Sequence, residues 1–277
     1  MNNFEKKSVM KDKVCIITGA SSGIGKALAF ELAGYKAKLV LAARNEKELE
    51  ELKPQLEKLG AEVMVVKTDV SIEADCKNLI EQTITRFHSI DVLINNAGIS
   101  MRAIFEDVEL SVLKRLMDTN FWGTVYCTKY ALPYLLASKG SVTGVSSIAG
   151  YKGLPGRTGY SASKFAMQGF LEVLRIENLK KDLHVLIACP GFTASNIRNT
   201  ALAKDGSMQG ESPRDEDKMM TAAEVAKHIV NAIRKRKNKI ILTSMGKMTV
   251  TLNKFFPKFM DKMVYGHMAK EPNSPIK

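Results

Sequence analysis

The sequence predicts an α/β fold in which helices cover both faces of a parallel sheet. Short apolar runs alternate with amphipathic stretches at intervals of about 25 residues, which is typical of repeated strand–helix units. The apolar runs are nearly continuous, as expected for strands that are buried on both faces. A glycine-rich turn at 19–25 follows the first run. Because right-handed crossovers link such strands, we expect one doubly wound domain.

Each apolar run is expected to form a strand. The first run, 14–18, has four apolar residues in five and ends at a glycine turn. The expected strands cover 14–18, 38–43, 62–67, 91–95, 141–146, 183–189 and 239–242.

The amphipathic stretches between these runs are expected to form helices. They cover 25–33, 46–59, 73–87, 110–136 and 159–179. Another helix begins at Thr221, whose hydroxyl can cap the N–H of Glu224 while the Glu224 carboxylate reaches back. A helical extension is expected at 245–268, where Pro257 kinks or restarts the helix.

Length and composition fit a folded domain. The 277 residues are 45% hydrophobic and 25% charged, which excludes a disordered or fibrous chain. No apolar run reaches the roughly 18 residues of a membrane span. Residues 1–13 lack the apolar stretch of a signal peptide, so we expect a cytoplasmic protein.

The basic charge is concentrated at the C-terminal end. The formal net charge is +12, and residues 234–277 hold 11 Lys/Arg against 2 Asp/Glu, which leaves only +3 for residues 1–233. A uniformly basic fold would indicate nucleic acid, which we do not expect as a partner here. A basic tail instead favours a membrane surface, an acidic partner or simply solubility.

The cysteines do not form a metal-binding pattern. They are scattered along the chain, without a CxxC or a Cys/His cluster, at Cys15, Cys76, Cys127 and Cys189. We expect buried free thiols and no metal site.

The turn after the first strand is suited to a phosphate group. Gly19 allows a tight exit from the strand, and Gly23 and Gly25 let backbone N–H groups and the helix start approach a pyrophosphate. The spacing is GxxxGxG rather than GxGxxG. The candidate cofactor contacts in this turn are Gly19, Ser21, Ser22, Gly23, Ile24 and Gly25.

The end of the second strand indicates which nicotinamide cofactor binds. A carboxylate that binds the ribose 2′-OH is typical of NAD sites, but the segment here reads Ala42-Ala43-Arg44-Asn45. The Arg44 guanidinium can pair with a 2′-phosphate through a planar fork. The sequence therefore favours NADP(H).

Three residues predict proton-transfer chemistry. Tyr160 and Lys164 lie four residues apart on one face of an expected helix. Ser147 lies at the carboxyl end of the fifth strand, at the sheet edge where ligands bind in open α/β folds. A phenol has an ordinary pKa of about 10, and a nearby ammonium favours the phenolate. We expect Tyr160 to exchange a proton with a substrate oxygen that Ser147 holds.

With these residues, the sequence resembles the short-chain dehydrogenases/reductases over 13–197, and more weakly to 243. The resemblance rests on spaced motifs at Thr18–Gly25, Asp69, Asn95-Asn96-Ala97-Gly98, Asn120, Ser147, Tyr160, Lys164 and Pro190-Gly191. The C-terminal tail resembles that of the hydroxysteroid-dehydrogenase-like branch, which hints at a hydrophobic, lipid-like ketone as substrate.

The resemblance implies roles for individual residues. Tyr160 is the general acid/base, Lys164 lowers its pKa and binds the nicotinamide ribose, and Asn120 anchors a water in a proton relay. Asp69 and Val70 border the adenine. The motif Asn95, Asn96, Ala97 and Gly98 stabilises the sheet beside the cofactor, and the nicotinamide side is contacted by Pro190, Gly191 and Thr193. The family often has a Thr five residues after the Pro, where this chain has Ser195.

The expected organisation is a catalytic Rossmann-like domain at 1–243 and a basic amphipathic extension at 244–277. A polar segment, about 194–220, contains Gly206, Gly210 and Pro213 and fits a mobile lid over the substrate. In the extension, one side of a helical wheel carries Lys247, Lys254, Lys258 and Lys262. The other side carries Met248, Leu252, Phe255, Phe256, Phe259 and Met263.

Two partners could cover this apolar side. We expect it to pack against protein, either on the body of its own chain or, as favoured here, across a homodimer or homotetramer contact, because soluble monomers rarely expose large apolar patches. The alternative is peripheral binding to an anionic membrane surface.

The sequence therefore predicts an NADP(H)-dependent oxidoreductase that interconverts a small-molecule ketone and a secondary alcohol by hydride transfer. A narrower alternative is the reduction of a keto-lipid, such as a 3-keto sphingoid base. An alternative of another class is a non-catalytic NADP-binding regulator. The substrate itself is not defined, because specificity depends on the loops.

Overall fold

Parallel strands form the central sheet in the computed structural model of the chain, which describes residues 10–194, 196–210 and 219–276. The strand order is β3-β2-β1-β4-β5-β6-β9, and every neighbouring pair is parallel. The strands are β1 (Val14–Thr18), β2 (Lys38–Ala43), β3 (Glu62–Lys67), β4 (Val92–Asn95), β5 (Ser141–Val145), β6 (His184–Cys189) and β9 (Lys239–Ile241). A second, two-stranded pair joins β7 (Thr193–Ala194) and β8 (Met220–Thr221).

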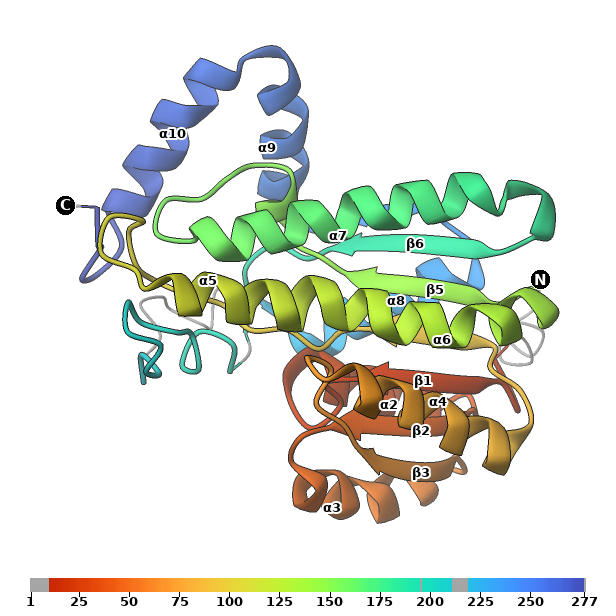
Figure 1. Cartoon of the computed structure of the whole chain (residues 1–277). Coiled ribbons are helices and arrows are strands. Elements are labelled where there is room, and N and C mark those ends of the chain that lie inside the picture. Colours follow the sequence, from red (N-terminus) through yellow and green to blue (C-terminus); the bar gives the residue numbers. More distant parts are fainter. Residues whose placement is uncertain (1–9, 195, 211–218, 277) are drawn as a thin grey trace.

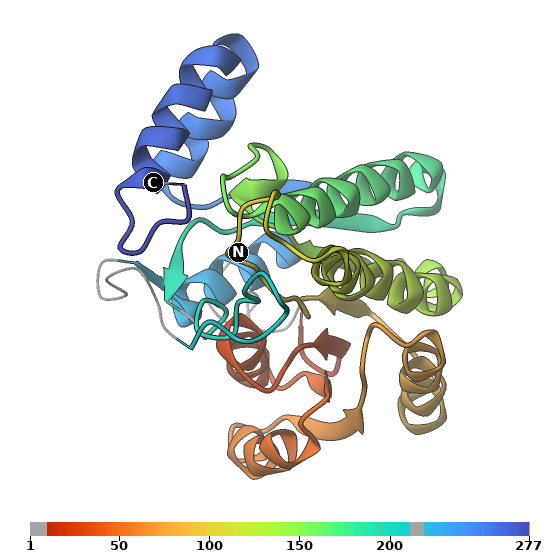
Figure 2. The ribbon, with the colours of Figure 1, turned by 60° about the vertical axis from the view of Figure 1, so that its left-hand side comes forward.

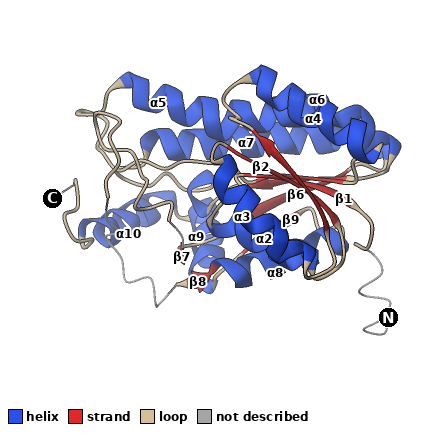
Figure 3. Ribbon diagram, turned by 90° about the horizontal axis from the view of Figure 1, so that it is seen from below, coloured by secondary structure: helices blue, strands red, loops and turns tan. Residues whose placement is uncertain are grey.

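Helices cover both faces of this sheet (Figures 1 and 3). One apolar core joins the sheet to α2 (Gly23–Ala33), α3 (Glu46–Glu57) and α8 (Ala222–Arg234). The core on the other face includes α4 (Glu73–Phe87), α6 (Gly123–Ala137) and α7 (Thr158–Glu177). The predicted doubly wound α/β fold is confirmed. The strand order reverses between β1 and β4, because β2 and β3 are added on one side of β1 and the later strands on the other, so the loops after β1 and β4 diverge and leave room for a ligand.

The expected elements are present, and most bounds agree within two residues. The expected helix at 110–136 is divided into α5 (Leu110–Leu116), a π-helical segment (Met117–Trp122) and α6. A π-helical turn inside an α-helix is a local widening that is frequent at functional sites, and simple apolar periodicity does not reveal it. Thr221 forms the predicted capping box with Glu224 at the start of α8. All four cysteines are free and buried.

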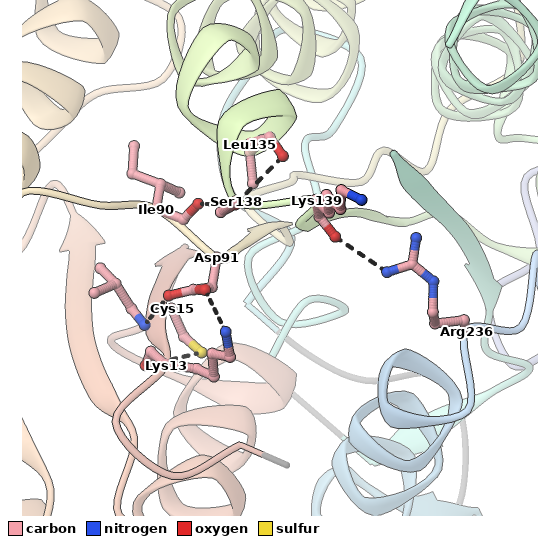
Figure 4. Close-up of polar contacts among 9 residues, drawn as sticks. Lys13, Cys15, Ile90, Asp91, Leu135, Ser138, Lys139 and Arg236 are labelled. Atoms are coloured by element: carbon pink, nitrogen blue, oxygen red, sulfur yellow. Dashed lines mark hydrogen bonds and ion pairs between the residues drawn. The ribbon is translucent and has the colours of Figure 1, made fainter. Parts of the chain in front are cut away.

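Polar contacts fix the amino ends of the strands, at the edge opposite the glycine turn (Figure 4). The Asp91 carboxylate binds the Lys13 ammonium at 2.7 Å and accepts the backbone N–H of Val14 at 2.9 Å. Ser138 donates its hydroxyl to the Ile90 carbonyl at 2.7 Å. These contacts set the register of β1, β4 and β5 at one edge and leave the carboxyl edge to form a site.

The C-terminal extension is a helical hairpin that projects from the sheet domain (Figures 1 and 2). It consists of α9 (Ser244–Phe255) and α10 (Pro257–Ala269), so Pro257 restarts the helix as expected. Val250 and Met260 are buried, and an ion pair joins Lys152 to Asp261 of α10. None of the helices in the described ranges is long and apolar enough to cross a membrane.

The apolar side of the hairpin is not covered by its own chain. Phe255, Phe256 and Phe259 are 71%, 59% and 60% exposed. Within a single chain these three side chains at the turn between α9 and α10 are left exposed, although Met260 and Asp261 of α10 contact protein. A contact with a second copy stays a prediction.

Candidate active site

The carboxyl edge of the sheet opens into a cavity of about 940 Å³. Its walls come from the loops after β1, β2, β3, β4, β5 and β6, from α7 and from the α9–α10 hairpin. The glycine turn, the Tyr160 helix and the C-terminal extension are far apart in the sequence, but all three line this cavity. The predicted site residues that line it are Gly19, Ser21, Ser22, Gly23, Ile24, Arg44, Asp69, Val70, Asn96, Ala97, Gly98, Ser147, Tyr160, Lys164, Pro190, Gly191 and Thr193.

The glycine turn is interlocked with the loop after β4. Gly19 and Gly23 have φ angles of 65° and 52°, which glycine adopts without strain. A Cβ on Gly19 would lie 2.8 Å from Ala97 Cα, and a Cβ on Gly25 would lie 2.0 Å from the Gly19 oxygen. Asn96 donates its side-chain amide to the carbonyl oxygens of Thr18 at 2.9 Å and Gly19 at 3.1 Å. Larger residues at these glycines would therefore force the two loops apart.

The start of α2 is prepared for an anion. Ser22 is the N-cap of the helix, and among the described residues its side chain makes no capping hydrogen bond. The first N–H groups of α2 and the hydroxyls of Ser21 and Ser22 thus remain available along the cavity wall. A helix N-terminus attracts phosphate through these donors and the helix dipole. The turn therefore fits the pyrophosphate of a dinucleotide.

Three predicted cofactor contacts beyond the glycine turn, Arg44, Asp69 and Val70, differ in charge and in the contacts that they make. Arg44 is exposed at the end of β2 and lines the cavity. The Asp69 carboxylate accepts the backbone N–H of Ser71 at 3.0 Å and its hydroxyl at 2.7 Å, so it shapes its own loop. Val70 packs on Gly123, where a Cβ would lie 2.8 Å from Val70 Cβ. At this end of the cavity, the exposed guanidinium of Arg44 and the apolar side chain of Val70 both line the wall.

Ser147, Tyr160 and Lys164 converge at the middle of the cavity. The Lys164 ammonium is 5.8 Å from the centre of the Tyr160 ring and donates to the Val145 carbonyl at 2.9 Å. Ser147 begins the short 3-10 turn Ile148–Gly150, and its hydroxyl accepts the backbone N–H of Ala149 at 3.1 Å. The helical spacing and the strand end thus bring together the three residues that the sequence singled out.

Burial sets the proton affinities of this group. It lowers the pKa of Lys164 to about 8, because the desolvated ammonium is disfavoured. It raises the pKa of Tyr160, and the hydrogen bond from Ser147 and the charge of Arg157 offset only part of this rise. The family resemblance implies a Tyr160 pKa lowered by Lys164, but in this structure the effect of desolvation outweighs the charge of Arg157 and the hydrogen bond with Ser147. Tyr160 is thus a protonated phenol at neutral pH, which is the proton-donating form.

Three predicted residues lie behind the cavity wall rather than on it. Asn120 is fully buried, and its side chain accepts the Ile99 N–H at 2.8 Å while donating to the Ser163 hydroxyl at 2.9 Å. Asn95 donates to the Thr128 hydroxyl at 3.0 Å. Gly25 is a close-packing glycine. The buried contact of Asn95 fits its expected role beside the cofactor, and the water-anchoring role of Asn120 stays a prediction.

The residues predicted to contact the nicotinamide follow β6. The Thr193 hydroxyl donates to the Gly191 carbonyl at 3.2 Å, and a Cβ on Gly191 would lie 2.7 Å from the Thr243 hydroxyl oxygen. Ser195 lies outside the described residues. The part of the expected lid at 196–210 is joined to the loop after β4, because the Leu202 carbonyl accepts the Arg102 N–H at 2.8 Å. The remainder of the lid, 211–218, is not among the described residues.

Sequence reasoning missed the residues at the far end of the cavity. Arg157 lies three residues before Tyr160, so its place beside the site could have been inferred from the helix start. The wall from the C-terminal hairpin could not, because a helical wheel does not show where the helix docks. That wall is formed by Met245, Met248, Thr249, Met263, Val264, His267 and Met268. The described residues contain no group of three or more His, Cys, Asp or Glu side chains that could hold a metal ion.

Comparisons with known proteins agree with this geometry. A family model described as short chain dehydrogenase matches residues 13–206. The 11-beta-hydroxysteroid dehydrogenase-like protein 4A of Arabidopsis thaliana is 40% identical over 253 residues, which cover 90% of this chain and 82% of the relative.

Two solved structures share the fold. A short-chain dehydrogenase/reductase from Burkholderia phymatum in complex with NAD has a TM-score of 0.79 and 26% identity, over 90% of this chain and 95% of that one. An alcohol dehydrogenase from Thermococcus sibiricus complexed with 5-hydroxy-NADP has a TM-score of 0.74 and 24% identity, over 83% of this chain and 95% of that one.

The buried ammonium of Lys164 predicts a pH-dependent stability. Its pKa is about 8 in the folded chain against an ordinary 10.5, so between these values the unfolded chain binds the extra proton. The contribution of Lys164 to the free energy of unfolding should therefore rise with pH across this window, by about 3 kcal/mol. Urea unfolding of the wild type and Lys164→Met at several pH values from 7 to about 10.5 measures the difference. A constant difference would contradict the burial of a charged lysine.

Proposed function

The chain belongs to the short-chain dehydrogenase/reductase family, and we propose that it interconverts an apolar ketone and its secondary alcohol with NADP(H). The observation that carries the proposal is the convergence of Ser147, Tyr160 and Lys164 in the cavity that also contains the glycine turn. A non-catalytic regulator would need the turn but not this trio. The family relationship itself supports an oxidoreductase that acts on CH–OH groups with a nicotinamide cofactor.

Ser147, Tyr160 and Lys164 have different roles in the proposed reaction. When bound, the nicotinamide cofactor supplies or accepts the hydride. The Ser147 hydroxyl holds the substrate oxygen beside Tyr160, and the Tyr160 phenol gives that oxygen its proton in the direction of reduction. A raised pKa keeps Tyr160 protonated for this step. The Lys164 ammonium, in a desolvated position, stabilises the phenolate that remains.

Charge at the outer end of the cavity supports NADP(H) over NAD(H). Arg44 is exposed at the end of β2, and among the described residues no carboxylate forms an ion pair with it. A guanidinium binds a phosphate in a bidentate manner. An NAD site would instead require a carboxylate at the strand end for the 2′-OH.

The substrate end of the cavity supports an apolar substrate. The hairpin contributes four methionines to its wall, Met245, Met248, Met263 and Met268, which adapt to irregular apolar shapes. Leu154 and Met208 complete this wall from the sheet domain. The surface fits a ketone on a ring system or a long chain, and a keto-lipid such as a 3-keto sphingoid base remains the narrower candidate.

The exposed end of the hairpin supports a peripheral contact with an anionic membrane. The apolar tip, Phe255, Phe256 and Phe259, lies among the exposed Lys254, Lys258 and Lys262. Aromatic residues insert at the headgroup boundary while lysines bind anionic lipids. Pairing two such tips in a dimer would bring like charges together. We propose a cytoplasmic protein that contacts the membrane through this tip.

The cofactor assignment is tested by Arg44→Asp. The variant removes a charge-assisted pair and adds repulsion, so NADPH binding should weaken by roughly 2–4 kcal/mol while NADH binding changes little. Fluorescence titration with both cofactors measures this. If the wild type binds NADH as tightly as NADPH, the assignment is wrong.

The chemistry is tested by Tyr160→Phe. This change keeps the ring and removes the proton, so turnover should fall by roughly two orders of magnitude or more while the Kd for NADPH is retained. The assay follows NADPH oxidation over a panel of ketosteroids, long-chain keto-lipids and small ketones. Ser161→Ala, on the next position of α7, is the matched control and should keep activity. Substantial turnover by Tyr160→Phe would rule out the proton-transfer role.

The membrane contact is tested by replacing Phe255, Phe256 and Phe259 together with serine. Wild type should float with vesicles that contain anionic lipid and detach at high salt, and the triple variant should not float. Phe165→Ser, which changes an exposed phenylalanine on α7, should behave as wild type. If the triple variant instead loses self-association by light scattering and vesicle binding is absent throughout, the tip is a contact between copies.

A further inference from the structure

The last residues of the chain return from the hairpin to the active site. Figure 1 shows the C-terminal end beside the loop that precedes α5. Pro275 lies against Gly156, where a Cβ would be 3.1 Å from the proline ring. Gly156 has a φ of 70° and accepts the backbone N–H of Ala103 at 3.1 Å. The C-terminal segment, 270–276, thus covers the loop that leads into the Tyr160 helix.

A buried carboxylate from this segment joins two arginines. Glu271 is 5% exposed, and its carboxylate lies 3.7 Å from the guanidinium of Arg102 and 3.9 Å from that of Arg157. Arg102 also donates to the carbonyl of Pro272. The side chains of Arg102 and Arg157 are only 4% and 12% exposed. The three charges therefore form a nearly dry cluster whose members come from three separate parts of the sequence.

The cluster depends on its carboxylate. Two buried guanidinium groups repel one another and are costly to desolvate, and breaking a buried ion pair leaves an uncompensated charge. Arg157 also donates to the Gly156 carbonyl at 3.2 Å. Without the negative charge of Glu271, the two buried guanidinium groups would repel one another, which favours a shift of one arginine toward water. Arg157 is the more accessible of the two and lines the open cavity, so it is the one that can leave its position.

Arg157 matters because of its neighbour Tyr160. The charge of Arg157 is one of the two influences that lower the pKa of Tyr160 against the effect of burial. The other groups around the phenol are Ser147 after β5, Lys164 on α7 and Cys189 on β6, while His267 of α10 lines the same cavity. Lys164 donates one hydrogen bond to the Val145 carbonyl. Arg157 is the N-cap of α7, three residues before Tyr160, and both residues line the cavity, so its charge lies at the same helix start as the phenol.

We propose that Glu271 is a positioning residue for proton transfer, which holds Arg157 beside Tyr160 so that the C-terminal segment completes the active site. The proposal rests on the proposed function. In reduction, the O–H bond of Tyr160 breaks and an O–H bond forms on the substrate oxygen. The phenolate keeps the electron pair, and the guanidinium of Arg157 stabilises its negative charge. A C-terminal segment far from Tyr160 in sequence therefore controls how readily that proton leaves.

The test compares Glu271→Gln, Arg157→Met and the double variant in the full-length chain. The first measurement needs no substrate: tyrosine labelled with ¹³C at Cζ is titrated by NMR, and the Tyr160 signal is assigned by its loss in Tyr160→Phe. Both single variants should raise the pKa of Tyr160, because each removes the guanidinium from the ring. If Glu271→Gln lowers the pKa of Tyr160 or leaves it unchanged, Arg157 has stayed in place without the charge of Glu271. That result would overturn the proposal.

The second measurement is steady-state kinetics with NADPH and a ketone. Glu271→Gln should lower kcat by roughly three- to tenfold with little change in the KM for NADPH. In the Arg157→Met background, Glu271→Gln should have no further effect on kcat. Additive effects would show that Glu271 does not act through Arg157. If no ketone is reduced by wild type, the proposed function fails, while the NMR titration still decides the role of Glu271.

A matched control separates positioning from simple anchoring of the tail. Asp261→Asn breaks the ion pair of α10 with Lys152 but leaves the Glu271 cluster intact. It should lower the melting temperature without moving the pKa of Tyr160 or kcat. Should Glu271→Gln not fold, Glu271→Asp retains the charge on a shorter side chain and should give a smaller shift in the same direction. A loss of thermal stability alone, with titration and kcat as in wild type, would mean that Glu271 only anchors the tail.

Discussion

The contact between the loop after β1 and the loop after β4 positions most of the site. Asn96 bonds both Thr18 and Gly19, and the glycines allow the backbones to approach closely. The contact continues across the cavity, because a Cβ on Gly98 would lie 3.1 Å from the Asn120 side-chain oxygen and 3.4 Å from the Lys164 ammonium. The phosphate turn and the catalytic helix are therefore parts of one packed unit. Displacing either loop would disturb the proposed cofactor binding and the proposed proton transfer together.

Desolvation is the main influence on the pKa values of Lys164 and Tyr160 in this unit. Lys164 is held in a buried position where its charge is disfavoured, and Tyr160 is kept protonated by the same surroundings. A phenol of raised pKa is a reluctant donor, so the positive charges near it determine how far the proton can move. In this fold one of those charges, Arg157, is paired with a carboxylate from the end of the chain. The C-terminal extension thus contributes electrostatics as well as an apolar wall.

The strands of the sheet and the three residues at the centre of the site could be predicted from the sequence. Each strand is a short apolar run, and the spacing of Tyr160 from Lys164 on a helix, with Ser147 at a strand end, left little freedom for their placement. Sequence did not reveal the π-helical turn at Met117–Trp122, since it preserves the apolar pattern of a continuous helix. Nor did it separate Asn120 and Asn95, whose amides serve buried contacts, from residues that face the cavity. The docking of the C-terminal hairpin and of Glu271 depends on contacts between distant parts of the chain, which local periodicity does not encode.

The central claim is that hydride and proton reach one substrate within this cavity. The most direct test incubates wild type with NADPH that carries deuterium at the transferable position of C4, together with the ketone panel, and analyses the alcohol by mass spectrometry. The account predicts deuterium on the carbinol carbon of an apolar alcohol, formed by wild type and nearly absent with Tyr160→Phe. An alcohol without deuterium, or no reduction of any ketone by a protein that binds NADPH, would contradict it.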